Sequence, residues 1–273
     1  MKTKRKPEYA LSENSKKSTQ DFKSANRVAS LIYKVFKSCM PRVSSRAQYQ
    51  KLCKRILKMM HEGSDLPLGQ RKCYHGDVTH LVGFQLNPYT SLQRIICCQP
   101  KMVVLPKEPA LEIFLPEISM VDVRGPAGTA YLNWQMSCCE VDADNYSVNT
   151  HWSAPLKIPM EGKVLMSAKK MKMPLPEMDG KILLVIATVN TYRWDNFRYG
   201  ENIKPLRSND RRYYAGEVVG AYYVKDGKLV LYETKQPTAN ASAQVMDSRQ
   251  EIAWEENAPV DTGKEQQRYN MNQ

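Results

Sequence analysis

From Gly69 to Glu233 the chain is a series of short β-type segments with no long helical pattern between them. These segments are rich in Val, Ile, Leu and aromatic residues, and Pro, Gly, Asn or Asp separates one from the next. The absence of intervening helices argues against a parallel α/β sheet. About ten such segments indicate an antiparallel sandwich or barrel. The expected strands lie in residues 78–86, 92–98, 101–106, 111–116, 118–123, 129–138, 163–168, 182–192, 217–224 and 228–233.

The clearest local prediction in this region is a hairpin in the sequence GAYYVKDGKLVLYE, residues 220–233. Asp226 and Gly227 tolerate the positive φ angles of a two-residue turn, and side chains alternate along both arms. We therefore expect adjacent antiparallel strands on either side of this turn.

The N-terminal part has a helical period instead. Apolar residues recur at helical spacing between residues 22 and 38, and again in RAQYQKLCKRILKMM, residues 46–60. Pro41 interrupts the pattern, and Ser45 with Gln48 fits a capping box for the second helix. Gly63 suits its C-cap. Two helices with a short connection predict an antiparallel helical hairpin over residues 21–64.

Positive charge is concentrated in the same region. Residues 1–60 contain 16 Lys and Arg against 3 Asp and Glu, a net charge of +13, whereas the rest of the chain carries 24 − 25 = −1. Such asymmetry predicts an acidic partner, because lysine and arginine displace the counterions of a phosphate backbone. The alternative is that the charges only face water. The candidate contacts are Lys34, Lys37, Arg42, Arg46, Lys51, Lys54, Arg55 and Lys58.

Residues 191–214 interleave arginine with aromatic side chains. Aromatic faces stack on bases or sugars, and guanidinium groups bind phosphate or carboxylate in a bidentate manner. The alternative is a long loop whose aromatic residues pack inward beneath the arginines. The candidate contacts are Arg193, Trp194, Phe197, Arg198, Tyr199, Arg207, Arg211 and Arg212.

Sequence motifs for enzymes are missing: the chain has no G-x-S-x-G, G-x-G-x-x-G, G-x-x-x-x-G-K-S/T or H-E-x-x-H. The segment CYHGDVTH places Cys73, His75, Asp77 and His80 close together, which is either a metal site or a polar turn before a strand; we expect the turn. The seven cysteines are an odd number without C-x-x-C, and we expect reduced, packed thiols. We therefore predict no cofactor, no metal and no catalytic site.

The segments ANRVASLIYKVFK, RAQYQKL and KMMHEG, followed by YLNWQ and MPLPEMDGKILLVIATVN, give the chain a resemblance to a known group of proteins. It resembles uncharacterised proteins of Bacteroidota that join a basic helical N-terminus to an immunoglobulin-like domain of unknown function. The resemblance covers about residues 22–230 and implies this layout but no activity.

The sequence thus predicts a mainly β protein, an antiparallel immunoglobulin-like sandwich at residues 70–235 preceded by the basic helical hairpin. Residues 1–20 are expected to be a disordered arm, and residues 236–273 a mobile, acidic polar tail. The N-terminus lacks the features of a secretory signal, and no apolar run is long enough to span a membrane, so we expect a cytoplasmic protein.

The function that we predict is non-enzymatic binding of an acidic macromolecule, with nucleic acid favoured over protein. One alternative is a structural subunit of a larger protein assembly, in which the helices dock on a partner protein. Another is an enzyme that acts on a phosphorylated or glycan substrate at residues 191–214.

Overall fold

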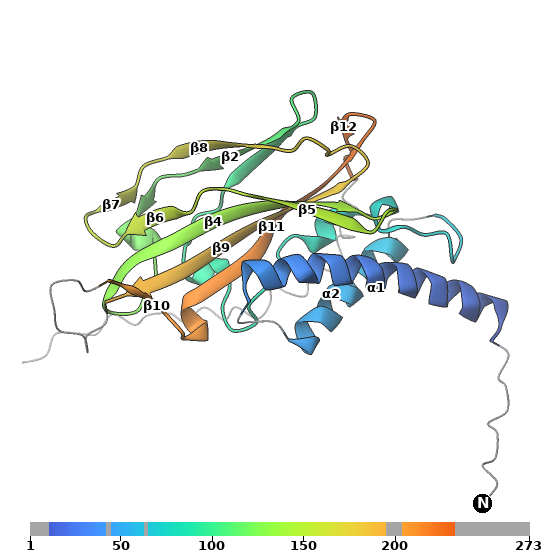
Figure 1. Ribbon diagram of the computed structural model, residues 1–273, viewed down its shortest axis with the longest axis horizontal. Coiled ribbons are helices and arrows are strands. Elements are labelled where there is room, and N and C mark those ends of the chain that lie inside the picture. Colours follow the sequence, from blue (N-terminus) through green and yellow to red (C-terminus); the bar gives the residue numbers. More distant parts are fainter. Residues whose placement is uncertain (1–10, 42–44, 63–64, 195–203, 233–273) are drawn as a thin grey trace, which may run out of the picture. The chain divides into compact units, whose positions relative to one another are not determined.

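The computed structural model describes residues 11–41, 45–62, 65–194 and 204–232. Residues 11–231 belong to one compact unit in which three layers follow one another (Figure 1). The helical pair, α1 (Glu13–Cys39) and α2 (Arg46–Glu62), lies on one face of a large antiparallel sheet. A smaller antiparallel sheet lies on the other face. The mainly β, antiparallel architecture and the N-terminal helical hairpin are confirmed.

The large sheet has seven strands in the described residues, with the central order β12-β11-β9-β4-β5; β10 also pairs with β9, and β6 with β4. Its strands are β4 (Thr129–Asp142), β5 (Ser147–Trp152), β6 (Leu156–Pro159), β9 (Ile182–Arg193), β10 (Leu206–Arg207), β11 (Tyr214–Lys225) and β12 (Lys228–Leu229). The small sheet has the order β1 (Lys101–Leu105), β2 (Ala110–Leu115) and β8 (Lys169–Pro174). Short strands β3 (Ile118–Ser119) and β7 (Val164–Met166) form a third pair.

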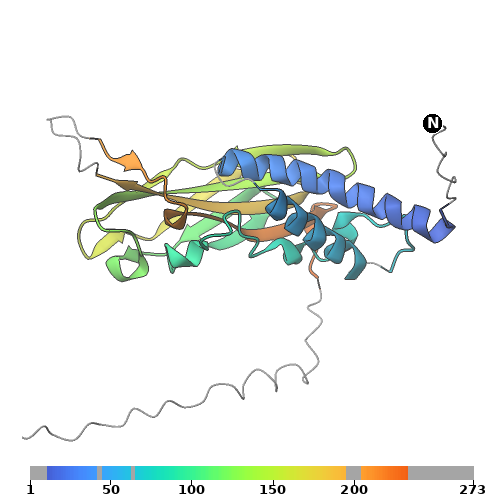
Figure 2. The ribbon, with the colours of Figure 1, turned by 90° about the horizontal axis from the view of Figure 1, so that it is seen from below.

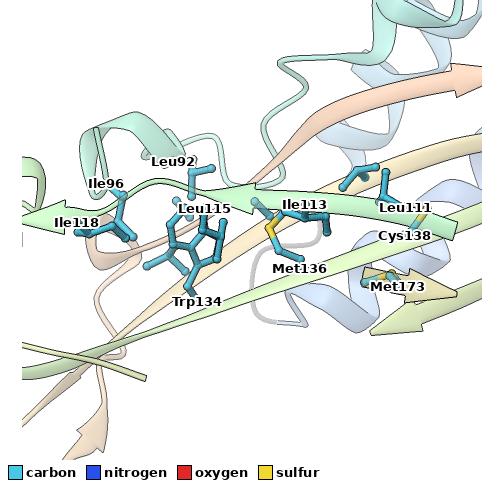
Figure 3. Packing of buried hydrophobic residues seen from close by; sticks show 14 of the residues in the cluster. Leu92, Ile96, Leu111, Ile113, Leu115, Ile118, Trp134, Met136, Cys138 and Met173 are labelled. Carbon is cyan, nitrogen blue, oxygen red and sulfur yellow. The ribbon is translucent and has the colours of Figure 1, made fainter. Parts of the chain in front are cut away.

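The main apolar core lies between the large and the small sheet (Figure 3). Leu111, Ile113 and Leu115 alternate on β2, and Trp134 and Met136 alternate on β4; all five are buried. Successive side chains of a strand point to opposite faces, so every second residue of each sheet contributes to this core. Helix α1 packs on the opposite face of β4 and on β5.

The predicted hairpin at Asp226-Gly227 is confirmed. Both residues have positive φ, 52° and 66°, and Val224 pairs with Leu229 while Lys225 pairs with Lys228. The second arm is shorter than expected and ends at Leu229.

Strands predicted at residues 78–86 and 92–98 were wrong. These segments contain the 3₁₀ turns η2 (Val78–Leu81) and η3 (Leu92–Arg94), and each contributes only one isolated β-bridge. The side chain of Asp77 accepts a hydrogen bond from the Thr79 amide at 2.8 Å, which favours a turn there. Conversely, the polar strands β5, β6 and β8 were not predicted, because pairing with apolar strands outweighs their own composition.

Helix α1 begins earlier than expected, so the predicted disordered arm is wrong for residues 13–20, whereas residues 1–10 lie outside the described residues. Ser12 is the N-cap, and its hydroxyl accepts a hydrogen bond from the Ser15 amide at 3.2 Å. Glu13 in the first turn also suits the positive end of the helix dipole. Further along, buried Asp21 accepts a hydrogen bond from the Gly69 amide at 3.0 Å. These polar signals explain a helical segment that contains no apolar stripe.

The expected capping box of α2 forms only in part. The Ser45 hydroxyl accepts a hydrogen bond from the Gln48 amide at 3.2 Å. The Gln48 side chain does not return to Ser45 but donates to the Gln85 carbonyl at 2.9 Å, so it joins the helix to another segment. The proposed C-cap Gly63 lies outside the described residues.

A candidate cationic groove beside helix α2

Helix α2 separates an apolar stripe from a row of lysines. Leu52, Ile56 and Met59 are completely buried. Lys51 and Lys54 point away from this stripe and are exposed. The helix is thus fixed by its apolar face, and its charged face remains available to a partner.

Residues 83–88 run beside α2 and are held by the edge of the large sheet. The Gly83 amide donates to the Val218 carbonyl at 2.8 Å, and the Leu86 amide donates to the Gly216 carbonyl at 2.7 Å. The Phe84 carbonyl accepts from the Val218 amide at 3.0 Å. These bonds tie the segment to β11, and the Gln48–Gln85 hydrogen bond ties it to α2.

A groove of about 460 Å³ lies between α2 and this segment. Among the described residues, its lining contains three cationic side chains and no carboxylate. The lining residues are Gln48, Lys51, Lys54, Arg55, Gly83, Phe84, Gln85 and Pro88. We call this feature the cationic groove.

Arg55 is the fixed cation of the groove. Its Nη1 donates to the carbonyls of His80 at 3.4 Å and Val82 at 3.2 Å, and its guanidinium lies 5.4 Å from the centre of the Phe84 ring. Phe84 in turn stacks on Phe36 of α1 with a centroid distance of 5.4 Å. Both helices therefore support the floor of the groove.

Most of the predicted helical cations are not neutralised by carboxylates within the part of the chain that the structure describes. Lys58 is the exception, with its Nζ 3.7 Å from Glu62, which also lies 3.2 Å from His80. Lys37 lies over the Tyr33 ring at 5.3 Å. The cations with no ion pair to a described residue are Lys34, Lys37, Arg46, Lys51, Lys54 and Arg55. Arg42 lies outside the described residues.

The arginines predicted in residues 191–214 have partners of their own. Arg212 binds both carboxylate oxygens of Asp210, with 2.7 Å between Nη2 and Oδ2. These hydrogen bonds hold the pKa of the Asp210 carboxyl below its ordinary value. Arg211 donates to the Tyr89 hydroxyl at 3.2 Å and lies over the same ring. The described end of this loop therefore favours the interpretation in which arginines cover aromatic rings.

The remaining loop candidates divide into two groups. Arg207 binds the Asn190 side chain and lies over the Tyr214 ring, and Arg193 ends β9. Trp194 is about half exposed, at 49%. Three candidates lie outside the described residues: Phe197, Arg198 and Tyr199.

The two sequence features, which are far apart in the chain, meet at residues 83–89. The Asn87 side chain donates to the carbonyls of Arg211 and Tyr214, at 2.7 and 2.6 Å. Pro88 lines the cationic groove, and Tyr89 contacts Arg211. Sequence reasoning missed this segment as a site, because it read residues 78–86 as a strand; the turn-forming pair Asn87-Pro88 was the available signal.

The residues of CYHGDVTH do not converge on one point. The His75 Nδ1 accepts from the Lys72 amide at 3.2 Å, Asp77 caps its own turn, and His80 approaches Glu62. Burial raises the pKa of the Cys73 thiol to about 12, which keeps it protonated at neutral pH. Across the described residues, no group of three or more His, Cys, Asp or Glu side chains is arranged to hold a metal ion.

The adjacent cysteines Cys138 and Cys139 of β4 lie in different environments. Cys138 belongs to the core between the sheets, and Cys139 points to the other face, toward Cys39 of α1. Burial raises the pKa of Cys39 to about 11 and also raises that of Cys139. All seven cysteines are free thiols.

Neither helix in the described part of the chain is long and apolar enough to cross a membrane. Comparisons with protein-family models, with curated proteins and with solved structures found no match to the chain.

Proposed function

We propose that this protein is a non-enzymatic binding protein that contacts nucleic acid through the cationic groove. The observation that carries the proposal is the lining of the groove, where Lys51, Lys54 and Arg55 lie together with no carboxylate from the described part of the chain. A phosphate backbone placed there releases its counterions to solvent, which favours binding at low salt. The immobilised Arg55 loses little conformational freedom on binding, and the two lysines follow the backbone from one side of the groove.

The proposal is tested by titrating duplex DNA, single-stranded RNA and a non-nucleic polyanion at two salt concentrations. We expect affinity for nucleic acid to fall steeply with salt, because each phosphate contact contributes about 0.7–0.9 to the slope of log K against log salt. The charge-reversal pair Lys51→Glu and Lys54→Glu should weaken binding and reduce this slope by about two.

A matched control separates the groove from net charge. Lys107 and Lys228 are exposed lysines outside the groove lining. Reversing both, Lys107→Glu and Lys228→Glu, changes the net charge by the same amount. Equal losses of nucleic-acid affinity in the two double variants, or an affinity that does not change with salt concentration, would contradict the groove as the contact surface.

A second candidate function, a subunit of a larger protein assembly, is favoured by one apolar surface. Val121 is 86% exposed and Val164 is 51% exposed, and both belong to the β3–β7 region, where the Met120 amide binds the Lys163 carbonyl at 3.0 Å. Light scattering after size exclusion of a nuclease-treated native lysate tests this candidate. A discrete protein complex that survives nuclease would favour assembly over nucleic-acid binding.

The two antiparallel sheets that share one core also support an immunoglobulin-like relationship for residues 70–235. Inter-strand NOEs, compared strand by strand with the pairing in immunoglobulin-like domains, test this relationship. A strand order in the larger sheet that differs from the order in immunoglobulin-like domains would contradict it.

A further inference from the structure

The helix-side face of the large sheet changes character where α1 ends. Beneath α1 the face is apolar: Ile182, Leu184 and Ile186 of β9 are buried, with Val141 of β4 beside them. Met40, directly after the helix, lies against Gly216 so closely that a Cβ there would clash with the Met40 sulfur. Figure 2 shows that the helices cover only one part of the sheet and leave the end near β10 without a helix.

Beyond Met40 the same face becomes polar and aromatic. Cross-strand pairing sets Lys157, Asn133 and Asn190 side by side in one row. The next row contains Tyr131, Tyr192 and Arg207. Paired residues of neighbouring strands point to the same face, and these two rows lie about 7 Å apart along the strands. We call these six residues the polar face.

The aromatic residues of the polar face are already arranged for stacking. The rings of Tyr131 and Tyr192 are parallel within 13°, with centroids 4.5 Å apart. The Lys157 ammonium lies 4.4 Å from the centre of the Tyr131 ring and is exposed. A planar group that stacks on Tyr131 would take the place of this ammonium, which could then contact an adjacent anion.

Hydrogen-bonding groups accompany these rings. Asn133 and Asn190 are directly paired and only partly buried. The Asn133 side chain makes no hydrogen bond to the described residues, whereas Asn190 accepts from Arg207. Within these two rows there are two cations and no carboxylate. The face therefore presents amide groups, ring faces and positive charge on a rigid sheet.

We infer that the polar face binds single-stranded nucleic acid. Unstacked bases offer planar faces for Tyr131 and free edges for the two asparagine amides, and the phosphates complement Lys157 and Arg207. A duplex hides its base faces and cannot use this arrangement. The inference rests on the proposed nucleic-acid function. It names single-stranded nucleic acid as the class that is bound, and it places this binding at a second surface, distinct from the cationic groove.

The experiment measures binding of a labelled oligouridylate, an oligothymidylate and a duplex to the full chain. Tyr131→Leu removes the ring but keeps an apolar side chain, and Tyr131→Phe keeps the ring. Loss of one stacked base costs about tenfold in affinity. We expect this loss for single strands with Tyr131→Leu, no loss with Tyr131→Phe, and unchanged duplex affinity with both. The two single strands differ in the ribose 2′-hydroxyl and show whether the face prefers RNA.

Lys157→Ala provides a second variant at an exposed position, where a folding defect is not expected. It should weaken single-strand binding by about threefold and reduce the salt slope by about 0.7. Thermal unfolding and circular dichroism establish that each variant is folded.

Equal single-strand affinity of folded Tyr131→Leu, Lys157→Ala and wild-type protein would overturn the inference. Salt-independent binding of an uncharged oligosaccharide that requires Tyr131 would also overturn it, in favour of a glycan. If Lys51→Glu with Lys54→Glu removes binding while the Tyr131 variants do not, the groove stands and the polar face fails. The reverse pattern retains the polar face and rejects the groove.

Discussion

Two lysine-rich surfaces lie on opposite faces of this protein, and they differ in whether carboxylates pair with their lysines. On the outer face of the small sheet, Lys170 lies 2.9 Å from Glu112 and Lys172 lies 2.5 Å from Glu108. In the cationic groove, Lys51 and Lys54 have no such partner among the described residues. Lys170 and Lys172 are therefore each balanced by a carboxylate, whereas Lys51 and Lys54 are not.

The difference shows why placement of charge matters more than its amount. Exposed ion pairs contribute little to stability, about 0–1 kcal/mol each, so the carboxylates beside Lys170 and Lys172 have their main effect on surface potential. The sequence locates the excess positive charge in residues 1–60, but the lysines of α1 and α2 differ in whether a carboxylate pairs with them. Lys58 is paired with Glu62, whereas Lys51 and Lys54 are unpaired among the described residues and line the groove beside residues 83–88.

The largest expected effect comes from detaching α2 from the body. A Cβ at Gly76 would clash with the Met59 carbonyl oxygen, a backbone atom that no rotamer change can move away. Gly76→Ala should therefore lower the free energy of unfolding by about 3 kcal/mol. Urea unfolding measures this loss.

The same variant tests whether the groove depends on this docking. Nucleic-acid affinity should fall with Gly76→Ala under conditions where the sheets remain folded. Gly128→Ala is a useful comparison, since Gly128 lies outside the groove lining and nothing lies within 4 Å of its Cβ position, although its φ of +77° strains any residue with a side chain. A folded Gly76→Ala protein of wild-type stability would contradict the close contact.

A second prediction compares the two lysine pairs directly. Lys51→Gln with Lys54→Gln should weaken nucleic-acid binding by about tenfold at low salt. Lys170→Gln with Lys172→Gln removes the same charge from the outer face and should change affinity by less than about twofold, because those charges are already balanced. Fluorescence anisotropy at matched salt measures both, and equal effects would remove the distinction between the surfaces.

A third prediction concerns the carboxylates that balance Lys170 and Lys172 on the outer face. Glu108→Gln with Glu112→Gln leaves Lys170 and Lys172 unpaired, next to the exposed Lys169. Polyanion affinity should rise by about threefold, and the salt slope should become steeper. The gain should persist in a protein that also carries Lys51→Gln and Lys54→Gln. A gain that requires the groove lysines would place the new binding elsewhere.

How much the sequence could predict depended on whether the signal was local. The Asp226-Gly227 turn and the apolar stripe of α2 need only neighbouring residues, and both were predicted correctly. Residues 92–98 were read as a strand, although Leu92, Ile95 and Ile96 follow a helical spacing; the 3₁₀ turn η3 covers Leu92–Arg94, and Ile95 is its C-cap. The wall of the groove could not be predicted from the sequence, because the Gly83 amide binds the carbonyl of Val218, which is far away in the chain. The polar face likewise could not be predicted, because its residues come together only through the register of β4 with β9.

The smallest effect is expected from pH, at the Glu108–Lys172 pair of the outer face. The hydrogen bond from Lys172 holds the pKa of the Glu108 carboxyl below its ordinary value of 4.5 and raises the pKa of Lys172. The pair therefore adds stability above about pH 4.5, and this contribution is lost as the pH falls through the folded-state pKa of Glu108. Because both groups are fully exposed, the difference in thermal-unfolding temperature between the wild type and Lys172→Gln should be small at neutral pH and should vanish in acid. An NMR titration should place the Glu108 midpoint higher in Lys172→Gln, while Glu177, which is paired with Lys181, should not move. An unchanged Glu108 midpoint would mean that the outer-face lysines are not neutralised in solution, and the contrast with the cationic groove would disappear.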